Sequence, residues 1–136
     1  MDFEGQYLKY EEYKNLGETA LEIMPFNLLE FEVRRKIDIR TQNRLKDLED
    51  IPDEVKLCEY KLINTITGYL KSSLNESNAN IASESIDGYS VNYITPDRIS
   101  EIVKSHNIEI NDIIRTYLLD VKINNEHILY VGVDKW

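Results

Sequence analysis

Apolar side chains recur every three or four residues along two long segments, and this spacing constrains the fold of the 136-residue chain more than any other feature. The first segment begins near Pro25, and its apolar stripe consists of Leu29, Val33, Ile37, Leu45 and Leu48. Thr41 occupies the one position between Ile37 and Leu45 where the spacing calls for an apolar residue. The second begins at Pro52, and its stripe consists of Val55, Cys58, Leu62, Ile66 and Tyr69, widened by Ile63 and Leu70. This is the period of an amphipathic α-helix, and proline is tolerated in a first helical turn. We therefore expect two long helices that pack antiparallel.

Shorter helices are expected on either side of this pair. Residues Tyr10–Leu16 predict a short helix that ends at Gly17, in the left-handed C-cap position that glycine favours. Thr95 and Pro96 open a fourth helix, whose apolar residues are Ile99, Ile102 and Val103. A fifth carries Ile110, Ile113, Ile114, Tyr117, Leu118 and Val121. The polar tract over residues 72–80, rich in serine and asparagine, is expected to be a loop.

The apolar period changes to two after residue 80, which predicts a β-hairpin arm over residues 81–94. An Asp-Gly pair favours the turn of a hairpin, because both central residues of a type I′ turn need positive φ. The arm residues are Ile86, Asp87, Gly88, Tyr89, Val91 and Tyr93. A lone hairpin is marginally stable in water, so we expect this arm to lean on the helices or on another subunit.

The last residues form an apolar extension rich in strand-forming side chains. It carries Ile128, Leu129, Tyr130, Val131, Val133 and Trp136. Exposed apolar strips usually mark a partner site, although residues 128–133 could instead fold back as a strand against the hairpin. The expected fold class is mainly α: a small helical bundle over residues 1–122, with a β-hairpin arm and an extended C-terminal tail over residues 123–136.

The charge of the chain is acidic overall but uneven along its length. Sixteen Lys and Arg against twenty-five Asp and Glu give a net charge of −9, which opposes a general attraction to nucleic acid or anionic lipid. Within the second helix, Lys36, Arg40 and Arg44 form a basic ridge, and Glu32 and Lys36 have the favourable spacing for an ion pair. The ridge could face solvent, another subunit or DNA phosphates.

No motif of enzyme chemistry stands out. The glycines form no phosphate-binding loop, and His106 and His127 lack the spacing of metal ligands. Cys58 is the only cysteine, which excludes an internal disulfide. No apolar run reaches the roughly 20 residues that span a bilayer. We expect no catalytic residue, no cofactor, no metal and no membrane partner, so the function should depend on surfaces.

Several segments resemble the head–tail connector (adaptor, or head-completion) proteins of long-tailed bacteriophages and related prophages. The matching segments cover most of the chain: Tyr7–Tyr13 with Leu16 and Gly17, Phe26–Glu32 running to Asp38, Thr41–Leu45, Ile51–Cys58, Ile81–Tyr93 and Glu109–Leu118. The stretch Ser83-Glu84-Ser85-Ile86-Asp87-Gly88-Tyr89-Ser90-Val91 is the most telling of them.

The resemblance implies a structural subunit of the virion neck, assembled in the host bacterial cytoplasm. Such subunits form a ring, dodecameric in the family, beneath the portal protein. The ring extends the DNA channel, through which DNA passes without sequence-specific binding, and it offers a docking platform to a stopper or tail-completion protein. The C-terminal segments of the family grip the portal, so the apolar residues of the tail are the expected portal interface.

Two rival functions fit the same composition. An acidic regulatory protein that mimics DNA should be a compact monomer or dimer, with its acids concentrated on one face. A small metal-dependent enzyme built on Asp, Glu and histidine is the weaker rival, because no spacing singles out a ligand set.

Overall fold

A computed structural model describes residues 3–17, 21–46, 48–77, 95–123 and 126–129. Within these ranges the chain forms five helices and one pair of short strands. They are α1 (Tyr10–Leu16), α2 (Ile23–Thr41), α3 (Asp53–Ser77), α5 (Pro96–Ser105), α6 (Asn107–Leu118), β1 (Lys122–Ile123) and β2 (Glu126–His127). The expected mainly helical fold class is confirmed.

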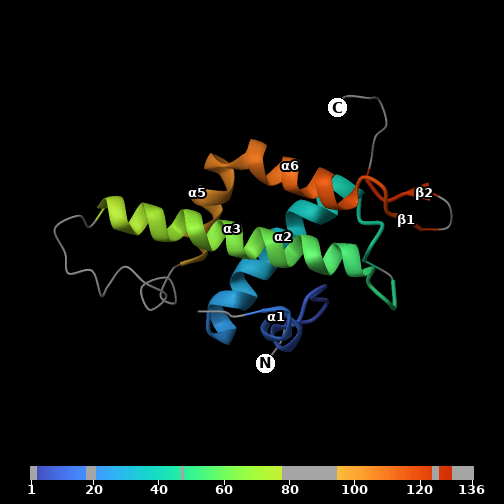
Figure 1. Cartoon of the computed structure of the whole chain (residues 1–136), viewed down its shortest axis with the longest axis horizontal. Helices are drawn as coiled ribbons and strands as arrows, with labels where there is room; N and C mark the ends of the chain where they lie inside the picture. The colour runs from blue at the N-terminus through green and yellow to red at the C-terminus, as the bar shows by residue number, and fades with distance from the viewer. Residues whose placement is uncertain (1–2, 18–20, 47, 78–94, 124–125, 130–136) are drawn as a thin grey trace.

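The two long helices lie in the middle of the molecule, with α1 on one side and α5 and α6 on the other (Figure 1). Helices α2 and α3 contact each other and run in opposite directions, crossing at an angle. Helix α3 also contacts α5 and α6, and α2 contacts α1 and α5. The expected antiparallel pair is therefore present, and α3 packs against α2, α5 and α6.

The core is built from the two predicted stripes and from the helices that cover them. All eight core positions expected in α2, α3 and the turn between them are buried: Leu29, Val33, Ile37, Leu45, Val55, Cys58, Leu62 and Ile66. On the other side of α3, Ile99, Ile110, Ile114 and Leu118 are fully buried. Burial raises the pKa of the Cys58 thiol, consistent with its expected role as a small core residue.

Helix α2 ends earlier than its apolar stripe predicts. After Thr41, Gln42 and Asn43 both adopt left-handed backbone conformations, with φ of 52° and 62°. The Asn43 amide donates to the Asp38 carbonyl at 2.9 Å, which closes the helix end. Leu45 therefore reaches the core from a turn rather than from a helix, and the predicted continuation to Leu48 is wrong.

Two other helix ends also differ from expectation. Helix α3 continues to Ser77, through the tract predicted to be a loop from residue 72. That tract contains no Gly or Pro, and extending an existing helix is far easier than starting one. Gly17 does follow α1, but its backbone is extended, with φ of 170°, and is not left-handed. Glycine suits the site because a Cβ there would collide with the Tyr60 hydroxyl.

The start of the C-terminal extension packs onto the helical core. Strands β1 and β2 pair antiparallel, with Lys122 opposite His127. The Ile128 amide then donates to the Val121 carbonyl at 3.0 Å, and Ile128 and Leu129 are 0% and 2% exposed. The expectation that the tail is exposed from residue 123 is therefore wrong for these two residues, because their side chains complete the core.

We expect Leu62→Ala to lower the free energy of unfolding by about 2–5 kcal/mol, because truncating a fully buried leucine removes apolar contacts and leaves a cavity. Urea denaturation followed by circular dichroism measures this change. Lys61→Ala, at an exposed position one residue earlier, is the matched control. A loss of less than about 0.5 kcal/mol for Leu62→Ala would contradict the core position, since such small values are typical of surface substitutions.

Candidate functional site

A groove with basic side chains lies between α2 and the pair α5–α6. Its volume is about 400 Å³, and we call it the basic groove. The lining residues are Glu32, Arg35, Lys36, Ile39, Ser100, Val103, Lys104 and Asn107. Three cations and one carboxylate thus gather in a chain whose net charge is −9. Local charge here is opposite in sign to the charge of the whole molecule.

The cations of the basic groove have no carboxylate partner among the described residues. The Lys36 ammonium donates to the Asn107 side-chain oxygen, which ties α2 to the first turn of α6. The expected ion pair between Glu32 and Lys36 is not formed, because Lys36 turns toward α6 instead. Arg35 lies over the Phe31 ring, with its guanidinium carbon 5.8 Å from the ring centre. With three cations against the one carboxylate of Glu32, the groove therefore keeps a net positive charge.

The three residues of the basic ridge do not form one exposed line on a helix. Lys36 and Arg40 lie on α2, whereas Arg44 follows its end and donates to the His127 carbonyl at 2.5 Å. Arg115 of α6, which the sequence pattern did not indicate, joins them. Burial lowers the pKa of Arg40, and Arg115 lowers it further. Burial and then Arg40 likewise lower the pKa of Lys36.

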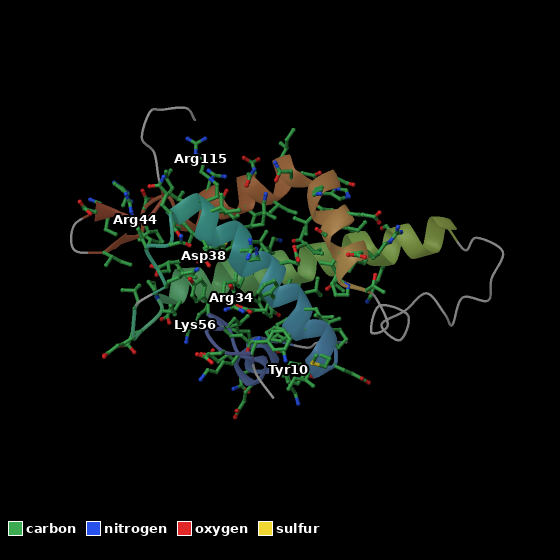
Figure 2. The ribbon with its side chains drawn as sticks, turned by 180° about the vertical axis from the view of Figure 1, so that it is seen from behind. Tyr10, Arg34, Asp38, Arg44, Lys56 and Arg115 are labelled. Atoms are coloured by element: carbon green, nitrogen blue, oxygen red, sulfur yellow. The ribbon has the colours of Figure 1, made fainter. Side chains whose placement is uncertain are left out.

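Figure 2 shows how these charges are distributed over the molecule. Arg44 and Arg115 lie on the side away from α1, whereas Tyr10 and Lys56 lie on the α1 side. Two large apolar side chains are exposed beside the cations: Ile39 in the basic groove, 68% exposed, and Ile108 next to its Asn107 wall, 83% exposed. Cations beside exposed apolar groups are typical of a surface that binds a protein partner.

A second groove, between α1 and the start of α3, has the opposite character, and we call it the acidic groove. Its two adjoining parts, of about 410 and 400 Å³, share Glu12, Asp53 and Lys56. Its carboxylates are Glu12, Glu49, Asp50 and Asp53, against two lysines, of which Lys56 is already paired with Glu12. Leu16 and Leu57, each 43% exposed, line the same groove.

Aromatic packing holds α1 in place as one wall of the acidic groove. Tyr13 is 2% exposed and lies between Phe26 of α2 and Tyr60 of α3, with ring centres 4.7 and 5.6 Å away. Its hydroxyl donates to the Asn64 side-chain oxygen at 3.0 Å. The tyrosine-rich composition of the chain thus serves partly to anchor this short helix, since a ring with a polar tip suits such sites.

A buried polar cluster holds the segment that precedes α1. The Gln6 side chain donates to Asn27 at 2.8 Å, and the Tyr7 amide donates to Glu30 at 3.1 Å. The Tyr7 hydroxyl donates to Asp38 at 2.5 Å, so burial and this carboxylate together raise the pKa of Tyr7. These bonds attach residues 6 and 7, which line the acidic groove, to one face of α2.

Two fully buried carboxyl groups, Glu30 of α2 and Glu59 of α3, lie at the centre of this cluster. Arg34 contacts Glu30 at 3.3 Å, whereas neither oxygen of Glu59 meets a hydrogen-bond donor. Burial raises the pKa of Glu59 well above its ordinary value, and the neighbouring Glu30 raises it further. Burial also raises the pKa of Glu30, opposed by Arg34 and the Tyr7 amide. The fold therefore favours the uncharged form of Glu59.

The sequence contains a signal for this pair that the pattern analysis missed. Glu59 falls at helical spacing between Val55 and Ile63 on the apolar face of α3, and Glu30 lies between Phe26 and Val33 in the same way. A charged residue on the buried face of a helix needs a partner or a proton. The described residues contain no set of three or more His, Cys, Asp or Glu side chains arranged to hold a metal ion.

Other expected site residues fall outside the described part of the chain. These are the whole hairpin arm, Ile86, Asp87, Gly88, Tyr89, Val91 and Tyr93, and the end of the tail, Tyr130, Val131, Val133 and Trp136. Among the described helices, none combines the length and the apolar character needed to cross a membrane.

Glu59→Gln should remove a pH dependence of stability. Because folding raises the pKa of Glu59, the folded state keeps a proton that the unfolded chain releases above about its ordinary value of 4.5. The free energy of unfolding therefore falls as pH rises through that range toward the raised pKa. Glutamine stays neutral, so the stability of Glu59→Gln relative to the unsubstituted chain should increase with pH.

Urea denaturation at a series of pH values, from acid to alkaline, measures this difference. Glu54→Gln, at an exposed position of the same helix, is the matched control. A difference between Glu59→Gln and the unsubstituted chain that stays constant with pH would show that Glu59 is not protonated in the fold.

Comparison with protein-family models, with curated proteins and with solved structures gives no match to this chain.

Proposed function

We propose that this chain is a structural head–tail connector subunit of a bacteriophage particle, which binds copies of itself and neighbouring rings and catalyses no reaction. The observation that carries the proposal is the pair of grooves of opposite charge, each with exposed apolar side chains. Subunits of a ring meet through two different surfaces, and complementary charges help to set their register. A subunit with one acidic and one basic surface meets that requirement.

The segments that resemble connector proteins contribute to both grooves, and mainly to the acidic one. Tyr7–Tyr13 and Ile51–Cys58 include most residues of the acidic groove. Phe26–Asp38 includes Glu32, Arg35 and Lys36 of the basic groove, whereas the other five lining residues lie outside the resembling segments. The resemblance therefore covers the acidic groove more fully than the basic one.

In this proposal the chain forms a ring in the virion neck, dodecameric as in the family, below the portal and above a stopper or tail-completion protein. The ring extends the DNA channel without reading the DNA sequence. An acidic chain suits such a channel, because a negatively charged lining does not hold the phosphate backbone. The hairpin arm over residues 81–94 would contact a neighbouring subunit or ring.

The proposed portal interface is narrower than the full apolar tail. Ile128 and Leu129 are buried in the core of the subunit, so they are not accessible anchors. Tyr130, Val131, Val133 and Trp136 remain as the proposed portal contacts. Tyrosine and tryptophan are the residues most often found as anchors at interface centres.

The rival DNA mimic differs in the surface it requires. Such a protein would present its carboxylates as one continuous acidic face, whereas here Arg35, Lys36 and Lys104 gather on one side of the molecule. A DNA mimic would also bind a host nucleic-acid enzyme rather than a portal. Binding to the portal therefore separates the two functions.

Deleting residues 130–136 should leave a folded helical subunit that no longer binds the portal. The core residues Ile128 and Leu129 are retained, so the circular dichroism spectrum should not change. Co-purification with the tagged portal protein of the same particle, and negative-stain images of the complex, measure the binding. The matched control deletes residues 122–136, which removes two core side chains and should lower the melting temperature. Portal binding by the shorter deletion would refute the tail contact.

A further inference from the structure

Four exposed carboxylates form an acidic corner, on a different part of the molecule from the basic groove. Its residues are Glu49, Asp50, Asp53 and Glu54, all exposed. They occupy the connection after α2 and the first turn of α3, and this connection projects beyond the end of α3 in Figure 1. Glu49, Asp50 and Asp53 also line the acidic groove, so the corner is part of that acidic surface. Its four carboxylates have the charge to meet a groove lined by cations.

We infer that the basic groove binds the acidic corner of a second copy of this chain, in a head-to-tail contact between neighbouring subunits. This inference rests on the proposed function and names the surfaces through which its subunits meet. The groove contributes Arg35, Lys36 and Lys104, and the corner contributes its four carboxylates.

The apolar side chains beside the charges favour a protein occupant. Ile39, in the groove, is 68% exposed, and Leu57, one turn after the corner on α3, is 43% exposed. Burying such side chains against each other stabilises a protein–protein contact, whereas a phosphate backbone offers them no apolar surface. A nucleic acid would also be repelled by the rest of a chain with net charge −9.

The electrostatics of the basic groove also favour a carboxylate from another subunit. Burial and the neighbouring Arg40 both disfavour the charged form of Lys36, so its pKa is lowered. A carboxylate entering from another subunit would reverse this effect, because opposite charges stabilise each other most where water is partly excluded.

Groove and corner also lie on different parts of the molecule, so one subunit can use both at once. The groove lies between α2 and α5–α6, whereas the corner leads into the start of α3. A contact between two different surfaces leaves a free groove at one end of every chain of subunits and a free corner at the other. Such contacts close into a ring when the rotation between neighbours allows it.

Charge reversal on each surface tests the contact. The groove variant carries Arg35→Glu and Lys104→Glu, and the corner variant carries Glu49→Lys and Asp50→Lys; all four positions are exposed. Sedimentation velocity over a concentration series, with and without the portal protein, measures assembly. Circular dichroism checks that each variant is folded. We expect each variant alone to weaken self-association roughly tenfold or more, since like charges then face each other across the contact.

Mixing the two variants gives the decisive result. In the mixture, the intact corner of the groove variant can meet the intact groove of the corner variant, and the two substituted surfaces are also of opposite charge. An equimolar mixture should therefore assemble, although each variant alone does not. A chain with all four substitutions should also assemble again, because the substituted acids of the groove then face the substituted lysines of the corner.

The outcomes separate this contact from the proposed function. If both variants assemble like the unsubstituted chain, or if neither their mixture nor the chain with all four substitutions assembles, the contact is wrong while the connector function stands. An unsubstituted chain that neither self-associates nor assembles on the portal would overturn the function itself. If the groove variant assembles normally but loses binding to a short DNA duplex, the groove binds phosphates and the subunit contact is refuted.

Discussion

Burial of α3 on more than one side is the constraint on which the rest of the described structure depends. The side chains of Leu62, Ile63, Ile66 and Leu70 are at most 1% exposed. Together they form a face of α3 that is wider than one neighbouring helix can shield from solvent. Helix α2 packs along part of this surface, and α5 and α6 pack along another. Because three helices must reach α3, α2 and α5 become neighbours as well, and the basic groove forms where they meet.

The buried carboxyl pair is a strongly polar element within this apolar arrangement. Burying a carboxyl group costs free energy unless the group is protonated or paired, so Glu30 and Glu59 are poor evidence for stability. Their neighbours suggest another role. Glu30 accepts the Tyr7 amide, and Asp38 accepts the Tyr7 hydroxyl, so the cluster sets the position of the segment that leads into α1. The position of that segment in turn determines one wall of the acidic groove.

The local charges of the two grooves, rather than the net charge of the chain, support the proposed function. A total of −9 predicts a molecule that avoids nucleic acid and anionic surfaces, and says nothing of a basic groove. The groove arises because Arg35 and Lys36 of α2 meet Lys104 of α5 across a gap of 67 intervening residues or more in the chain. Surfaces of both signs on one small subunit suit the proposed assembly with further copies.

The amino-acid sequence by itself determined the helices, their order and most of the core. Apolar residues at helical spacing mark a buried face whatever covers it, which is why all eight expected core positions in and near α2 and α3 are buried. Helix ends were less predictable: α2 stops at Gln42 and Asn43 because two residues accept a left-handed backbone, and no strong signal such as glycine announces it. The tertiary structure alone decided which charges lie together. Lys36 turns to Asn107 rather than to Glu32, and Ile128 and Leu129 turn into the core rather than outward. These outcomes depend on contacts between residues far apart in the chain, and periodicity along a single helix carries no information about them.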